Sequence, residues 1–133
     1  MRFFMLLKLF CLLTALFSFS LDAKSQPAYR NEWKTFQTAA LSHQSEIPGW
    51  CCPEKATAMM DLIYEVRPRI CVEIGVFGGS SIYPTASALK FLNEGTVYAI
   101  DPWMTSPCLE GYASDNPNYQ WWNDLDLERI YLD

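Results

Sequence analysis

Two acidic residues and a set of glycines stand where they could bind a polar ligand together. Glu73 lies near the end of the apolar segment Ile70–Ile74, and glycines follow it at positions 75, 78 and 79. Asp101 ends a second apolar segment. Glycines ahead of a helix let the backbone approach a ligand closely enough to donate its N–H groups. A carboxylate at the end of the neighbouring strand can accept two hydrogen bonds from a ribose diol.

The elements that would hold these residues form a short alternating series. Ile70–Ile74 is apolar except for Glu73, which is typical of a strand that is buried on both faces. Helices and strands that alternate with short links indicate a βαβ unit and a parallel pair of strands. The expected series is a helix at 53–67, a strand at 70–74, a turn at 75–79, a helix at 80–92 and a strand at 96–100. Gly95 is expected in the left-handed conformation that ends the second helix.

Two common nucleotide-binding motifs do not fit the glycine turn. A phosphate-binding P-loop requires a lysine after its last glycine, whereas Gly79 is followed by Ser80 and Ser81. A dinucleotide motif would need glycines at positions 77 and 80, which are Phe77 and Ser80. These residues disfavour a nicotinamide or sugar-nucleotide enzyme. The spacing that fits is an acidic residue at 73 with glycines at 75 and 79.

This spacing resembles the first motif of the class I S-adenosylmethionine-dependent methyltransferases. The segments Val72–Ser81 and Tyr98–Trp103 are most similar to the branch related to catechol O-methyltransferase. The resemblance covers about residues 53–103. It implies an α/β, Rossmann-like methyltransferase fold with helices flanking a parallel sheet, and S-adenosylmethionine as the cofactor.

The resemblance also implies a set of cofactor-binding residues. Glu73, Gly75 and Gly79 would surround the methionine part of the cofactor. Asp101 would bind the ribose hydroxyls, and Trp103 would lie on the adenine side. No residue of the chain corresponds to a catalytic group, so the catalytic residues and the methyl acceptor stay unassigned.

Residues around the turn leave alternatives open. Ser80 and Ser81 fit either donors to a ligand carboxylate or N-caps of the following helix. Gly78 fits either a ligand contact or plain turn geometry. Past Trp103 the chain becomes loop-like, and a further helix is expected over Trp121–Leu132.

The N-terminus resembles a targeting segment. Met1-Arg2 supplies a positive start, and Leu9–Phe19 is an apolar run of the length found in signal peptides. We therefore expect a cleaved export signal over 1–23 and a periplasmic or secreted protein, with an uncleaved membrane anchor as the alternative. A polar extension at 24–52 and a partial S-adenosylmethionine-binding domain at 53–133 would follow.

Composition and length limit the classes of function. The chain has 133 residues, a net charge of -5 and no basic stripe, which argues against a nucleic-acid partner. Its single histidine, His43, and the absence of a Cys-x-x-Cys motif argue against a zinc site, and no residue is assigned to a metal.

Two strands fall well short of the seven-stranded sheet of a complete methyltransferase. We therefore expect a truncated, methyltransferase-like fragment. The alternative is an exported, non-catalytic binding or interaction protein, because S-adenosylmethionine is made in the cytosol.

Overall fold

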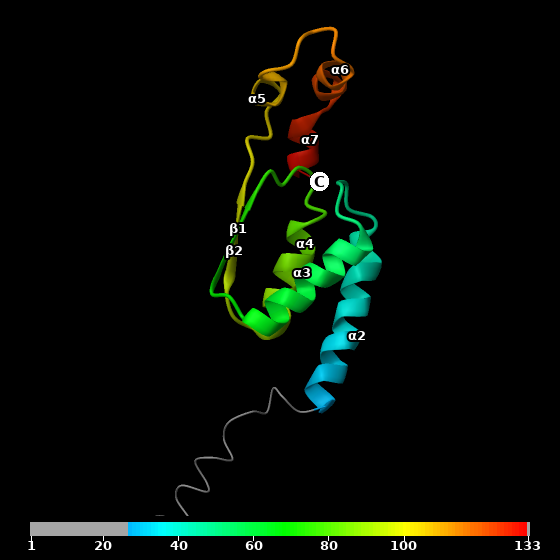
Figure 1. Cartoon of the computed structure of the whole chain (residues 1–133), viewed down its shortest axis with the longest axis vertical. Coiled ribbons are helices and arrows are strands. Elements are labelled where there is room, and N and C mark those ends of the chain that lie inside the picture. The colour runs from blue at the N-terminus through cyan, green and yellow to red at the C-terminus, as the bar shows by residue number, and fades with distance from the viewer. Residues whose placement is uncertain (1–26, 133) are drawn as a thin grey trace, which may run out of the picture. The chain divides into compact units, whose positions relative to one another are not determined.

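The computed structural model describes residues 27–132, so the expected signal or anchor at 1–23 lies outside the described residues. The chain divides into two compact units between Phe36 and Gln37. In the first unit Trp33 is buried and stacks on Phe36, with ring centroids 6.3 Å apart. No helix among the described residues is both long and apolar enough to cross a bilayer. The elements, labelled in Figure 1, are α2 (Pro27–Gln44), α3 (Pro53–Val66), β1 (Ile70–Ile74), α4 (Ile82–Leu92), β2 (Thr96–Ile100), α5 (Thr105–Leu109), α6 (Pro117–Asp124) and α7 (Leu127–Leu132).

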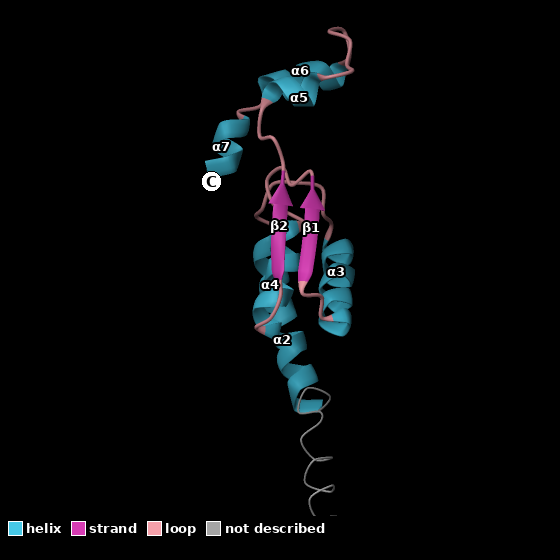
Figure 2. Ribbon diagram, turned by 90° about the vertical axis from the view of Figure 1, so that its left-hand side faces the viewer, coloured by secondary structure: helices cyan, strands magenta, loops and turns pink. Residues whose placement is uncertain are grey.

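Strands β1 and β2 pair in parallel, as the βαβ pattern predicts. Ile70 lies opposite Thr96, and the register continues to Ile74 opposite Ile100. Helices α3 and α4 lie on one face of this two-stranded sheet (Figures 1 and 2). The expectation of an α/β fold with a parallel sheet and flanking helices is thus confirmed at this level.

Much of the core lies between α3 and α4, and no residue of β1 or β2 is fully buried. In α3 the buried residues Ala56, Met60 and Ile63 recur at the spacing of one helical face. Ala88 and Leu92 are the corresponding buried residues of α4. Pro53 begins α3 at a position where no N–H is needed within the helix, which fixes the start of the helix after Cys52.

The other face of the sheet differs from the prediction. We expected β1 to be buried on both faces, but its residues alternate between exposed and half-buried. Successive residues of a strand point to opposite faces of the sheet, and the register aligns the exposed residues of β1 with those of β2 on one face. This face points away from α3 and α4, and no described element covers it. We call this set the apolar sheet face: Ile70, Val72, Ile74, Tyr98 and Ile100, each more than half exposed.

The predicted helix over Trp121–Leu132 is wrong in its boundaries. The structure divides this region into α6 and α7, because Leu125 is extended (φ -77°, ψ 135°). Helix α6 begins earlier than expected, since the Asn116 side chain accepts a hydrogen bond from the Asn118 N–H and Pro117 follows as the first helical residue. Gly95 has the expected positive φ (+89°), but it does not end α4 as expected, because the left-handed Asn93 is the C-cap of this helix.

Candidate functional site

Asp101 ties together the two segments that follow the strands. Its Oδ2 accepts a hydrogen bond from the Phe77 N–H (2.9 Å), and its Oδ1 accepts one from the Trp103 N–H (2.9 Å). The Trp103 indole N–H donates to the Phe77 carbonyl (2.9 Å), which closes a ring of three hydrogen bonds. We call these three residues the Asp101 clamp. It holds the turn after β1 against the segment after β2.

The clamp stabilises two residues with unusual backbone conformations. Phe77 (φ +52°) and Trp103 (φ +42°) are left-handed although neither is glycine. Such conformations cost about 1–2 kcal/mol each and persist only where the surroundings enforce them. The Asp101 carboxylate provides that restraint through the N–H groups of both residues. Each carboxylate oxygen retains lone pairs that could accept a hydrogen bond from a ligand.

The glycine turn at 75–79 uses some of its N–H groups within the protein. The Gly75 N–H donates to Ile100 O (2.9 Å), which extends the parallel ladder, and the Gly79 N–H donates to Val76 O (3.0 Å). Gly75 (φ +79°) and Gly79 (φ +93°) need the left-handed conformation that glycine allows. Within residues 27–132 the N–H groups of Val76 and Gly78 have no acceptor. The turn motif predicts that N–H groups of this kind bind a ligand.

Glu73 points toward the start of α4. Its Oε1 accepts a hydrogen bond from the Ser81 hydroxyl (2.7 Å), and the side chain is half-buried. Ser81 is the N-cap residue of α4 by position, but its side chain donates to Glu73 and makes no capping hydrogen bond to the helix. Glu73, Ser81 and Gly75 line a depression of about 470 Å³ together with Lys55 of α3. No group of three His, Cys, Asp or Glu residues in the described chain could hold a metal ion.

Trp103 lines a second depression at the same end of the sheet. Its ring lies 4.9 Å from that of Tyr131, at an interplanar angle of 52°. With Pro102, Met104 and Glu128 these rings border a space of about 410 Å³. An opening of this size and composition is suited to a planar heterocycle.

Residues before α3 also build the site, which the sequence did not reveal. The buried Gln44 side chain donates to Cys51 O (2.7 Å) and to Ser80 O (3.2 Å), and the Cys51 N–H donates to Ser80 Oγ (3.3 Å). Ser80 therefore fixes the preceding loop and does not cap α4. Burial raises the pKa of the Cys51 thiol, which keeps it protonated and neutral.

Close packing explains two glycines of this region. A Cβ at Gly78 would lie 2.5 Å from the Pro48 carbonyl oxygen, and a Cβ at Gly49 would collide with the Ser80 hydroxyl. Gly78 is thus required for the approach of the loop, which supports the turn-geometry alternative. These contacts join residues distant in sequence, so no local pattern could have indicated them.

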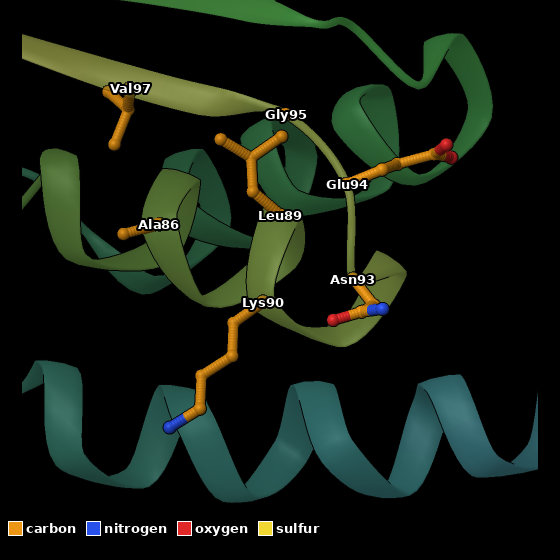
Figure 3. A pocket seen from close by; sticks show the side chains of 7 residues that line it. All are labelled: Ala86, Leu89, Lys90, Asn93, Glu94, Gly95 and Val97. Carbon is orange, nitrogen blue, oxygen red and sulfur yellow. The ribbon is translucent and has the colours of Figure 1, made fainter.

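A third depression lies at the opposite end of the sheet, away from the predicted residues. It has a volume of about 510 Å³ and is wide open (Figure 3). Its lining residues come from the end of α4 and the start of β2: Ala86, Leu89, Lys90, Asn93, Glu94, Gly95 and Val97. It contains neither the turn nor a strand-end acid, so we do not assign it to the site.

The predicted site residues therefore gather at one end of the sheet. Asp101 and Trp103 meet the turn that carries Gly75 and Gly79, and Glu73 lies at its start. No protein-family model, no curated protein and no solved structure matches the chain.

Proposed function

We propose that the chain binds S-adenosylmethionine at the glycine turn, as the cofactor-binding part of a Rossmann-like methyltransferase. In this arrangement the methionine part lies near Glu73 and the turn. The ribose hydroxyls bind Asp101, and the adenine occupies the depression beside Trp103. The acceptor and the catalytic residues are not assigned.

The observation that carries the proposal is the contact between the turn and the second acidic residue. The Phe77 N–H donates to Asp101 Oδ2 (2.9 Å), which holds the carboxylate against the turn whose Val76 and Gly78 N–H groups have no acceptor among the described residues. The ends of parallel strands are the usual place for such ligands in α/β sheets. The depression at Trp103 and Tyr131 adds an aromatic surface on the side where an adenine would extend.

Calorimetric titration of the full chain with S-adenosylhomocysteine tests the proposal. We expect saturable binding, and weaker binding by Glu73→Gln. This variant removes a charge but keeps an oxygen for the Ser81 hydroxyl. Loss of a charged hydrogen bond costs about 1.5–3 kcal/mol, which corresponds to roughly a tenfold or greater loss of affinity.

The matched control is Glu110→Gln, which removes a charge from an exposed position beyond α5 and should leave the affinity unchanged. Absence of binding at millimolar ligand would overturn the proposal. Equal binding of free adenosine and of S-adenosylhomocysteine would show that the methionine part makes no contact, which also contradicts the arrangement.

A second candidate function is that of a non-catalytic interaction protein. The apolar sheet face favours it, because parallel sheets are normally covered on both faces and large exposed apolar patches mark contact sites. This candidate predicts that the titration with S-adenosylhomocysteine shows no binding while the chain remains folded.

A further inference from the structure

Four aromatic rings from three distant segments meet beside the glycine turn. Trp50 comes from the loop before α3, Phe77 from the turn itself, and Trp121 and Trp122 from α6. We call them the tryptophan cluster. The Trp50 ring lies 4.8 Å from Phe77 and 5.8 Å from Trp121, measured between centroids.

The cluster remains open to solvent although its members are among the largest apolar side chains. Trp50 is 68% exposed and Trp121 is 43% exposed. The ring of Trp122 meets those of Trp121 and Phe77 at 76° and 90°. Rings at such angles form a corner, in which one compact ligand can contact more than one ring.

The backbone that carries Trp50 and Phe77 is held by contacts on either side of each ring. Gly49 packs closely against Ser80, and Cys51 is held by hydrogen bonds to Gln44 and Ser80. Trp50 stands between these two anchored residues, so its backbone is held in place on both sides. Phe77 is likewise held in its left-handed conformation by Asp101. Rigid presentation of exposed rings lowers the entropy lost on binding.

The charges near α6 indicate the kind of ligand. Arg129 is the single basic residue between Asp101 and Leu132, and the acidic residues there are Asp101, Glu110, Asp115, Asp124, Asp126 and Glu128. Helix α6, which carries two of the rings, contains Asp124 and no basic residue. The faces of aromatic rings attract cations, and tryptophan does so most strongly.

We infer that the tryptophan cluster is a binding site for a small organic cation that carries an alkylated ammonium group. The ring faces contact the cation, and the net negative charge of the segment that carries α6 raises its local concentration. This inference does not depend on S-adenosylmethionine binding, because none of its contacts involves the free N–H groups of the turn or the depression beside Trp103.

Titration calorimetry with two ligands of equal shape tests the inference. Choline carries the positive charge, and 3,3-dimethylbutan-1-ol replaces its nitrogen by carbon. We expect the full chain to bind choline on the order of tenfold more tightly than the neutral alcohol, because the charge supplies the cation–π attraction. Trp50→Leu and Trp121→Leu should each weaken choline binding several-fold.

The control variant is Tyr112→Leu, which removes an exposed aromatic ring outside the cluster and should leave choline binding unchanged. Thermal unfolding of each variant separates a lost contact from a lost fold. Equal affinity for both ligands, or no binding of choline by the unaltered chain, would overturn the inference. A parallel titration with S-adenosylhomocysteine shows independently whether the cofactor proposal holds.

Discussion

Asp101 determines the local geometry more than any other predicted residue. The resemblance assigned it to ribose hydroxyls, but in the described structure both carboxylate oxygens already accept N–H groups of the protein. Asp101 therefore has a structural role whether or not a ligand binds. A loss of binding in an Asp101 variant would combine these two effects, which is why Glu73→Gln is the cleaner test of the cofactor site.

The Asp101 clamp leads to a prediction about stability. Asp101→Ala leaves the N–H groups of Phe77 and Trp103 without their acceptor, so we expect the free energy of unfolding to fall by about 1–3 kcal/mol. Asp101→Asn keeps one oxygen and should show a smaller loss. Urea denaturation measures both values. Asp115→Ala, at an exposed position, should change stability by less than about 0.5 kcal/mol. Equal stability of Asp101→Ala and the unaltered chain would show that the clamp is not significant.

At the scale of the elements, the sequence predicted the strands and the two helices beside them. Apolar runs bounded by proline and glycine define β1, β2, α3 and α4. In these segments the apolar periodicity and the flanking turn residues indicate the same boundaries. The division between α6 and α7 was not predictable in this way, since Leu125 is apolar and no proline or glycine marks the break. Local pattern also says nothing about the hydrogen bonds from Gln44 to the loop before α3.

The link from α4 to β2 allows a matched test of packing. A Cβ at Gly95 (φ +89°) would lie 2.5 Å from Pro68 O and 2.8 Å from Leu89 Cδ2. Gly111 has a similar φ (+84°) but open space around it. Gly111→Ala therefore adds only backbone strain of about 1–2 kcal/mol. Gly95→Ala should lose clearly more in urea denaturation, because overpacking adds about 1–3 kcal/mol. Equal losses in the two variants would contradict the close approach at Gly95.

For the molecule as a whole, the feature that the sequence did not reveal is the uncovered side of the sheet. An apolar run such as Ile70–Ile74 predicts a buried strand, yet burial depends on what lies against each face. Helices α3 and α4 cover one face (Figure 2), and the described residues supply nothing for the other. The candidate site is less affected, since its hydrogen bonds arise from the turn and the strand ends.

The apolar sheet face should be visible to a hydrophobic dye. We expect the chain to bind anilinonaphthalene sulfonate while folded, and the double variant Val72→Thr with Ile74→Thr to bind less. Threonine is accepted in strands, so the free energy of unfolding should change by less than about 1 kcal/mol. Val97→Thr makes the same change on the half-buried, opposite face. It should lower stability without lowering dye binding. Unchanged dye binding in the double variant would contradict the assignment of the dye site to this face.

The placement of the tryptophans has a consequence for spectroscopy. The chain has five tryptophans, and four of them contact Phe77: Trp103 through its indole N–H, and Trp50, Trp121 and Trp122 through their rings. Indole emission depends on the polarity around the ring. The intrinsic fluorescence of this protein therefore reports mainly on the polarity around Phe77 in the glycine turn. A shift in the emission of these four rings would accordingly report a change at that turn, with no label added.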